Sequence, residues 1–311
     1  MKTAFIFSGQ GSQYAGMGKE LYDNFDCVKD IFDRADKALG FKLTDICFGE
    51  DERLNQTEYT QPALLTMSTA VSALVKQKGL KCDYAAGLSL GEYSALVEAG
   101  VMDFEEAVCL VRKRGRFMTE AVPAGEGAMC AVLNLDADKI LSACESVKDT
   151  GRCMIANYNC PGQIVIAGDK AAVEKAAEIV KEMGARRAVM LNVSGPFHTS
   201  LLKPASDRLN EELKHITLGD FKVPVITNLT AEVVGSKDEV TDILTKQVMN
   251  PVKWEQSVRK MLELGVDTFV ELGPGKTLAS FVKKVTKEAA VYNVEDIKTL
   301  DKMCEGLGLN A

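Results

Sequence analysis

Short apolar runs alternate with longer amphipathic stretches along most of the chain. Residues 3–7 form an apolar run that ends at a glycine-rich loop, which predicts a short buried strand followed by a turn. Residues 62–78 carry apolar side chains at helical spacing, between Pro62 and Gly79, which predicts a helix. A brief strand is predicted at 83–86. Strands that alternate with helices indicate an α/β core.

The same alternation continues further along the chain. Residues 87–99 are typical of a tight turn that leads into a helix. Asp103 and the acids behind it favour the start of a second helix that runs to residue 118, because acidic groups stabilise helix N-termini. Strands are also predicted at 223–226 and 268–271, helices at 240–248 and 254–264, and at most a helix after residue 293.

The pattern changes between residues 127 and 192. Strands are predicted at 128–133, 153–157, 163–166 and 188–191, and helices at 136–146 and 171–183. This β-α-β-β-α-β order is that of a ferredoxin-like unit, which can be inserted in a larger domain. We therefore expect a small ferredoxin-like domain at 125–192 and a large domain made of 1–124 and 193–311.

Composition narrows the class of protein. The 311 residues are 46% hydrophobic and 26% charged, as in an ordinary globular protein, and no apolar run is long enough to span a membrane or serve as a signal peptide. We expect a cytoplasmic protein. The nine cysteines include no CxxC pair, which favours reduced thiols over disulfides or a zinc site.

The net charge of −7 argues against nucleic-acid binding, and an acidic protein partner would need a local basic patch. Two candidates are the segment 112–116 and the pair Arg186 and Arg187. The alternative for either is a solvated helix face.

The strongest local motif is Gly-Leu-Ser-Leu-Gly at residues 87–91, between a predicted strand and a predicted helix. In this context GxSxG forms a nucleophile elbow, which would expose Ser89 and direct the Leu90 amide at an oxyanion. An ordinary turn remains the alternative, because GxSxG also arises by chance.

A serine nucleophile needs a base, and the chain has only two histidines. His215 lies in a charged helix end and is predicted to be a solvated surface residue. His198 precedes the apolar helix that begins near Leu201, and it is the better candidate base.

Several motifs together resemble the malonyl-CoA:acyl carrier protein transacylase family, in the same order and over nearly the whole chain. They are Phe-Ser-Gly-Gln-Gly-Ser-Gln at 7–13, Gly-Leu-Ser-Leu-Gly-Glu-Tyr-Ser-Ala-Leu at 87–96, Arg114-Gly115, Asn-Tyr-Asn-Cys-Pro-Gly-Gln at 157–163, Phe197-His198, Gln-Val-Met-Asn-Pro at 247–251 and Glu-Leu-Gly-Pro-Gly at 271–275. The resemblance implies an α/β-hydrolase-like core.

The resemblance also implies roles for individual residues. Ser89 would carry the acyl group and His198 would act with it as a dyad, oriented by the backbone carbonyl of Gln247 rather than by an acid. The amides of Gln10 and Leu90 would form the oxyanion hole. For Gln10, a loop residue that ends a strand is the alternative.

Arg114 would bind the free carboxylate of malonyl, which suits a guanidinium because its N–H groups can make two parallel hydrogen bonds. Phe197 would crowd out a methylmalonyl branch, a limited source of discrimination. The alternative for Arg114 is an arginine on the protein surface, and the alternative for Phe197 is a side chain that only packs. The family usually has histidine before the nucleophile, where this chain has Leu88, and Ser8 replaces a common proline.

The resemblance implies transfer of malonyl from malonyl-CoA to the phosphopantetheine thiol of acyl carrier protein, in fatty acid synthesis, by a monomer that uses no metal or redox cofactor. One rival is an α/β-hydrolase, although no HGGG-like loop or Ser, Asp/Glu, His order is evident. Another is a non-catalytic carrier-binding module.

Overall fold

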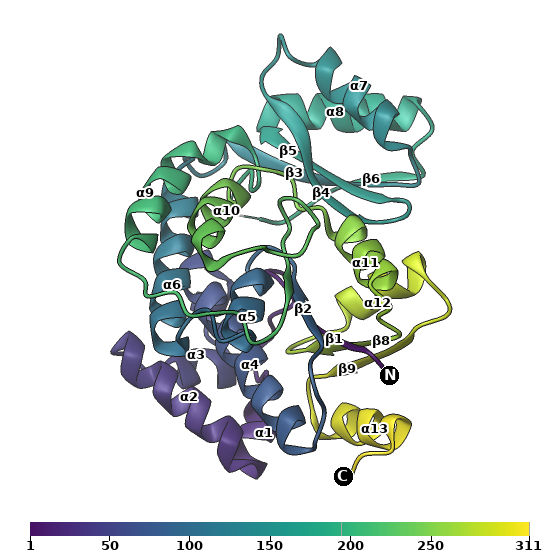
Figure 1. Cartoon of the computed structure of the whole chain (residues 1–311). Coiled ribbons are helices and arrows are strands. Elements are labelled where there is room, and N and C mark those ends of the chain that lie inside the picture. Colours follow the sequence, from purple (N-terminus) through teal and green to yellow (C-terminus); the bar gives the residue numbers. More distant parts are fainter. Residues whose placement is uncertain (194, 311) are drawn as a thin grey trace.

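The computed structural model describes residues 1–193 and 195–310 and contains two β-sheets (Figure 1). The larger sheet has five strands in the order β7-β2-β1-β8-β9, and all its strand pairs are parallel. Its strands are β1 (Thr3–Phe7), β2 (Tyr84–Gly87), β7 (Val225–Ile226), β8 (Thr268–Leu272) and β9 (Ala290–Val294). This is the predicted α/β core, with β1 at its centre.

Helices lie on both sides of this sheet, some in contact with its strands and others packed on those helices. They are α1 (Lys19–Asn24), α2 (Asp26–Leu39), α3 (Leu43–Phe48), α4 (Thr57–Gln77), α5 (Gly91–Glu98), α6 (Phe104–Glu120), α9 (Lys203–Leu213), α10 (Val240–Gln247), α11 (Trp254–Glu263), α12 (Thr277–Val285) and α13 (Ile297–Leu307). Short 3-10 turns lie at Glu52–Asn55, Ser200–Leu202 and Lys237–Glu239.

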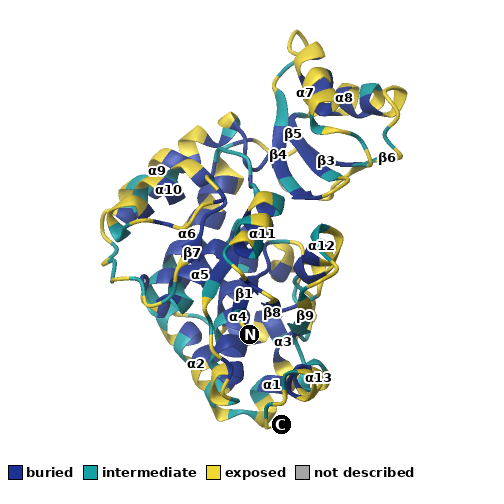
Figure 2. Ribbon diagram, turned by 45° about the vertical axis from the view of Figure 1, so that its right-hand side comes forward, coloured by how far each residue is buried: buried dark blue, intermediate teal, exposed yellow. Residues whose placement is uncertain are grey.

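Alternate residues of β1 enter two different hydrophobic cores. Phe5 and Phe7 pack in the core that includes α4, α5 and α6, whereas Ala4 and Ile6 pack against α11 and α12. Side chains alternate across a strand, so a central strand that is covered on both faces must be apolar throughout. Figure 2 shows the result, with dark blue buried strands beneath helices whose outer faces are yellow. The continuous apolar run at 3–7 is thereby explained.

The smaller sheet is antiparallel and has the strand order β4-β5-β3-β6. Its strands are β3 (Gly127–Leu133), β4 (Cys153–Cys160), β5 (Gln163–Asp169) and β6 (Arg187–Met190), and its helices are α7 (Ala137–Ser146) and α8 (Lys170–Glu182). Both helices cover one face, at the top of Figure 1. This is the predicted ferredoxin-like unit, inserted between α6 and α9 of the α/β-hydrolase-like core.

Some predicted elements differ from the observed ones. The helix expected to begin at Pro62 begins at Thr57 and includes Pro62, whose missing N–H removes one bond to the carbonyl of Glu58. The stretch before α4 forms α1, α2 and α3, which were not predicted. After residue 293 the chain forms the helix α13, within the expectation of at most a helix, whereas β9, which ends at Val294, was not predicted. Ser194 and Ala311, part of the expected large domain, lie outside the described residues.

Among the residues that the structure describes, no helix has both the length and the apolar character needed to cross a membrane. All nine cysteines are free thiols.

Candidate active site

The candidate site lies where neighbouring parallel strands of the large sheet end. Gln10 follows β1, Ser89 follows β2 and Asn228 follows β7, and these three strands are adjacent. Parallel strands have their carboxyl ends at one edge of the sheet, so residues far apart in sequence meet there. The small sheet contributes Met129, Val165 and other residues to the same pocket.

Ser89 sits on a sharply turned backbone with a φ of 54°, which is uncommon for a residue other than glycine. The flanking glycines make this turn possible. A Cβ on Gly87 would overlap the backbone of Gly91, and a Cβ on Gly91 would overlap the carbonyl oxygen of Phe7. The strand, the turn and α5 therefore form the nucleophile elbow that the GxSxG motif predicts.

The Ser89 hydroxyl is paired with His198. His198 Nε2 lies 2.7 Å from Ser89 Oγ, and Nδ1 lies 2.9 Å from the backbone oxygen of Gln247. A carbonyl oxygen can only accept, so Nδ1 carries the hydrogen and Nε2 is free to take the serine proton. Burial and the nearby charge of Arg114 lower the pKa of His198 from 6.5 to about 4, which keeps the imidazole neutral at neutral pH.

Arg114 lies beside this pair and is buried, with only 1% of its surface exposed. Its Nη2 donates to Ser89 Oγ at 3.2 Å and to Gln247 Oε1 at 3.0 Å, and its Nη1 donates to Gln61 Oε1 at 2.9 Å. Burial lowers the pKa of the guanidinium, which nevertheless stays charged. The alternative of a surface arginine is therefore wrong.

Gln10 and Leu90 both line the pocket around Ser89. Within the described residues, neither backbone amide donates a hydrogen bond, so both are available to an oxyanion. The Gln10 side chain is held by a bond from Nε2 to Thr57 Oγ1 at 3.1 Å. Leu90 is the N-cap residue of α5, whose N-terminus adds a favourable dipole.

The pocket has a volume of about 260 Å³ and is lined by strands of the small sheet and by loops and helices around the large sheet. Leu88, Met118, Phe197 and Phe281 give it apolar walls, and Phe197 is 7% exposed.

Among the described residues no cluster of three or more His, Cys, Asp or Glu side chains could hold a metal ion. His215 is exposed, as predicted, and does not line the pocket.

Sequence reasoning missed three buried residues that hold this site. Asn228 Oδ1 accepts from the Ser89 amide at 2.6 Å, Gln61 supports Arg114, and Glu92 accepts from Gln247 Nε2 at 3.0 Å. Glu92 directly follows the elbow, within one of the motifs on which the resemblance rests. An acid at this position, at the start of an apolar helix, was a signal in the sequence that pointed to a buried role. For Asn228 and Gln61 the sequence offers no signal.

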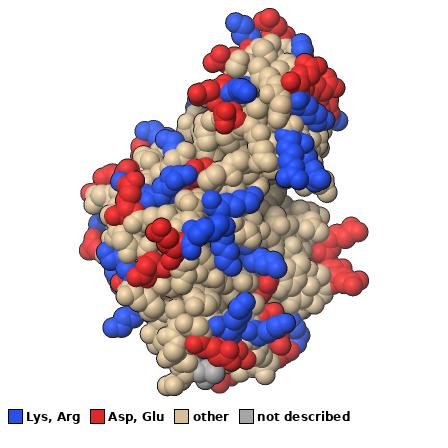
Figure 3. Space-filling view, turned by 90° about the vertical axis from the view of Figure 1, so that its right-hand side faces the viewer, with Lys and Arg blue, Asp and Glu red and all other residues tan. Residues whose placement is uncertain are grey.

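Basic side chains gather near the notch between the narrow upper part of the molecule and the larger lower part (Figure 3). Arg186 and Arg187, at the start of β6, are exposed, and so are Lys283 and Lys284 of α12. Lys284 Nζ lies 3.5 Å from the side-chain oxygen of Gln163, which lines the pocket. Arg187 is paired with Leu133, which is itself paired with Gln163, so Arg186, Arg187, Lys283 and Lys284 form one basic face at the edge of the pocket.

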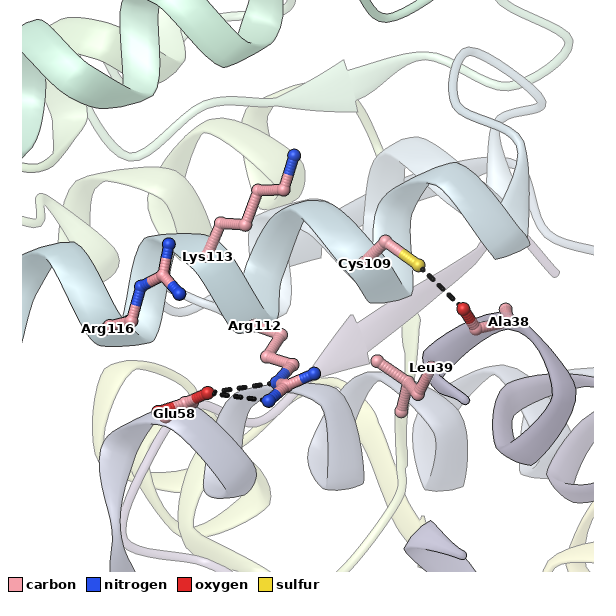
Figure 4. Close-up of a pocket in the computed structure, with 7 residues that line it drawn as sticks. All are labelled: Ala38, Leu39, Glu58, Cys109, Arg112, Lys113 and Arg116. Carbon is pink, nitrogen blue, oxygen red and sulfur yellow. Dashed lines mark hydrogen bonds and ion pairs between the residues drawn. The ribbon is translucent and has the colours of Figure 1, made fainter. Parts of the chain in front are cut away.

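The other candidate basic patch, 112–116, is not one continuous face. Arg112 pairs with Glu58 at 2.9 Å, Lys113 pairs with Glu212 at 2.7 Å, and Arg114 points inward to Ser89. Figure 4 shows Arg112 and Lys113 with Arg116 around a pocket of about 210 Å³ on the outer side of α6. Arg116 in turn lies 3.7 Å from Glu120, so each of these three cations already has an acidic partner and the pocket offers little free positive charge to an anion.

The fold and the site are those of an acyl transferase domain, the family whose model matches residues 4–309. Over 302 residues, the chain is 49% identical to the malonyl CoA-acyl carrier protein transacylase of Bacillus subtilis (strain 168), covering 96% of this chain and 95% of the relative.

Solved structures agree with this match. The crystal structure of malonyl CoA-acyl carrier protein transacylase from Clostridium perfringens ATCC 13124 superposes with a TM-score of 0.97 at 46% identity, covering 99% of this chain and 98% of the other. A malonyl-transacylase solved in complex with its type II PKS acyl-carrier protein gives 0.96 at 40% identity, covering 98% and 100%. The chain belongs to the malonyl CoA-acyl carrier protein transacylase family.

Proposed function

We propose that this chain transfers the malonyl group of malonyl-CoA to the phosphopantetheine thiol of acyl carrier protein through an ester on Ser89. One observation carries the proposal: the Ser89 hydroxyl contacts both a neutral histidine and a buried guanidinium, at 2.7 and 3.2 Å. The histidine can activate the serine. The guanidinium can bind the carboxylate that distinguishes malonyl from acetyl.

In the first half-reaction, His198 Nε2 takes the proton of Ser89 Oγ as the oxygen attacks the thioester carbonyl carbon. The carbonyl oxygen becomes an oxyanion that accepts hydrogen bonds from the Gln10 and Leu90 amides. The tetrahedral intermediate collapses, the C–S bond breaks, and the sulfur of coenzyme A leaves with the proton from His198. Malonyl remains as an ester on Ser89.

The second half-reaction runs the same steps in reverse with a different thiol. His198 takes the proton of the phosphopantetheine thiol, and the thiolate attacks the ester carbonyl. The oxyanion again faces the Gln10 and Leu90 amides, and Ser89 regains the proton from His198 as it leaves. One thioester replaces another, so the free-energy change is small, and apolar walls that include Phe197 and Leu88 limit attack by water.

The geometry also supports selection for malonyl. Arg114 is rigidly held by Gln61 and Gln247, so its charge is pre-organised for a carboxylate. Phe197 lies in the same pocket and limits the space for a branched acyl group. Leu88, where the family usually has histidine, lines the pocket but makes no contact that the proposed steps require.

Acyl carrier protein is proposed to dock beside the basic face that includes Arg186 and Arg187, and the related complex with a carrier protein supports this kind of partner. We further propose that the protein is a cytoplasmic monomer of fatty acid synthesis. In this proposal residues 125–192 form the small domain, and 1–124 with 193–311 form the large one.

A transfer assay tests the proposed function. The protein is mixed with radiolabelled malonyl-CoA and holo acyl carrier protein, and label is followed in carrier protein and in free malonate. Label in the carrier protein, dependent on Ser89, is the expected result. Rapid malonate release without carrier protein would instead indicate a hydrolase, and an unconsumed thioester would indicate a non-catalytic carrier-binding module.

A further inference from the structure

Glu92 is a buried acid directly behind the nucleophile. It lies in the first turn of α5, three residues after Ser89, and only 2% of its surface is exposed. Its Oε2 accepts from the backbone amide of Asn228 at 2.8 Å and from Gln247 Nε2 at 3.0 Å. The proposed reaction steps do not use it. A buried carboxylate is costly, so its retention beside the site calls for a role.

The role follows from which atoms can donate. An ionised carboxylate only accepts hydrogen bonds, and an arginine only donates them. Gln247 lies between the two: its Nε2 donates to Glu92 and to the Ser89 carbonyl oxygen, and its Oε1 accepts from Arg114 Nη2. Only one orientation of the Gln247 amide satisfies all three partners. Glu92 and the Ser89 carbonyl together hold the NH₂ end of the amide, so that the oxygen end faces Arg114.

The same chain of contacts links two buried charges. Arg114 and Glu92 are both almost fully buried, and Glu92 is an acid whose charge acts on the guanidinium. Burial raises the pKa of Glu92, and the hydrogen bonds it accepts and the charge of Arg114 oppose that rise by favouring the ionised form. The amide of Gln247 joins the two groups without direct contact between them, so Glu92 acts on the guanidinium through this amide while Nη2 still reaches Ser89 Oγ. A direct ion pair would instead occupy the groups that a substrate carboxylate needs.

We propose that Glu92 is a positioning residue for malonyl selection: it fixes the Gln247 side-chain amide, which in turn aims Arg114 at the acyl pocket. The inference rests on the proposed malonyl transfer. Glu92 itself touches no substrate. Its loss affects malonyl, which needs Arg114, far more than acetyl, which has no carboxylate.

The test compares acylation of Ser89 by malonyl-CoA and by acetyl-CoA in Glu92→Gln. Both hydrogen bonds that Glu92 accepts go to Oε2, so the amide oxygen of the substituted side chain can still accept them, but the negative charge that strengthens the bond from Gln247 and acts on Arg114 is lost. We expect the malonyl rate to fall by about 10- to 100-fold, the effect of one charge-assisted hydrogen bond, while the acetyl rate changes by less than about threefold.

Two other variants serve as controls. Glu92→Asp keeps an acceptor-only carboxylate, and the ratio of malonyl to acetyl rates should stay near that of the wild-type protein even if both rates fall. Glu271→Gln removes another buried carboxylate, which accepts from Leu278 and Ala279 away from the pocket. Glu271→Gln should lower the stability of the protein without changing the ratio of malonyl to acetyl rates. It therefore separates a specific effect on Arg114 from a general effect of destabilisation.

If Glu92→Gln does not fold, Gln247→Met tests the same relay, because it removes the amide and keeps the backbone carbonyl that orients His198. It is expected to lose malonyl preference in the same way. A folded Glu92→Gln or Gln247→Met protein that keeps the wild-type ratio overturns the proposal. A wild-type protein without malonyl preference would instead contradict the proposed function.

Discussion

Ser89 is held at every polar atom. Its amide donates to Asn228 Oδ1, its carbonyl accepts from Gln247 Nε2, and its hydroxyl contacts His198 and Arg114. A left-handed backbone at a residue other than glycine costs free energy and persists only where its surroundings fix it. These contacts supply that constraint, and they leave the hydroxyl at the pocket in the geometry of a nucleophile.

The lowered pKa of His198 predicts that acylation of Ser89 continues to an unusually low pH. We call the pH at which the rate has fallen by half the acid limit. Because the imidazole must be neutral to act as a base, the rate should be nearly constant between about pH 5 and 7 and fall only near pH 4. Single-turnover acylation by malonyl-CoA across this range measures the limit, with circular dichroism to confirm folding. A rate that already halves near the ordinary pKa of 6.5 would contradict the assigned environment.

Arg114 is one cause of that lowered pKa. In Arg114→Ala, the acid limit of acylation by acetyl-CoA should therefore move upward toward the ordinary histidine value. Acetyl-CoA is the suitable substrate because it does not need the guanidinium. An unchanged limit would show that burial alone sets the pKa of His198.

Phe197 should control the space available to a branched acyl group. Phe197→Ala is expected to reduce discrimination against methylmalonyl-CoA by about 10- to 200-fold, the range for one methyl contact in a pocket. The ratio of kcat/KM for the two substrates measures this effect. A ratio that does not change would support the alternative that Phe197 only packs the loop.

The sequence suggested the candidate nucleophile and base, which the structure places together, but not the residues that hold them in position. Ser89 and His198 could be proposed from the motif and from the scarcity of histidine, and Arg114 and Gln247 needed the family resemblance. Asn228 and Gln61 come to the site only because the chain folds. Asn228 lies 139 residues after Ser89, and Gln61 lies on α4. Convergence of this kind leaves no spacing pattern in a single sequence.

At the scale of elements, the strand β2, the elbow and α5 act as one unit. The elbow fits only because glycine at 87 and 91 lets backbone segments touch, including the end of β1 at Phe7. Close backbone contact of this kind tolerates no side chain. The motif is therefore explained by steric contact as well as by chemistry.

Gly91→Ala should destabilise the protein and inactivate it. The added methyl would overlap the Phe7 carbonyl, so α5 must shift, at a cost of about 1 to 3 kcal/mol or more in unfolding free energy. Urea denaturation measures the loss. Gly235→Ala is the matched control, because its methyl meets only the flexible end of Glu239, and it should change stability by less than about 0.5 kcal/mol. Equal stability of the two variants would contradict this account.

Element prediction succeeded where the apolar pattern was long or bounded by turn residues. The small unit was recovered in full order because each strand and helix has its own clear period. The strand β9 was missed because it is a five-residue edge strand and only partly buried. The helix α2 was missed although Val28, Ile31, Phe32 and Ala35 follow helical spacing, so that signal was present in the sequence.

At the scale of the whole molecule, the small sheet lies over the carboxyl edge of the large sheet and encloses the pocket between them. The chain is acidic overall, with a net charge of −7, yet exposed basic residues lie beside the pocket entrance. A local positive field on an acidic protein favours an acidic partner in one orientation.

Charge reversal tests this docking face. The double variant Arg186→Glu, Arg187→Glu should raise the KM for acyl carrier protein by about tenfold or more at low salt, with little change in acylation by malonyl-CoA. The matched control is Lys298→Glu, Lys302→Glu, which makes the same change in net charge at exposed positions of α13. An equal effect of both variants would show that only total charge matters.

The most direct test of the central claim is the mass of the intact protein after mixing with malonyl-CoA. We predict one added malonyl group, absent in Ser89→Ala and much reduced in Arg114→Ala, with acetyl-CoA labelling the wild-type protein far less. A malonyl adduct that persists in Ser89→Ala, or a folded wild-type protein that is never labelled, would contradict the account.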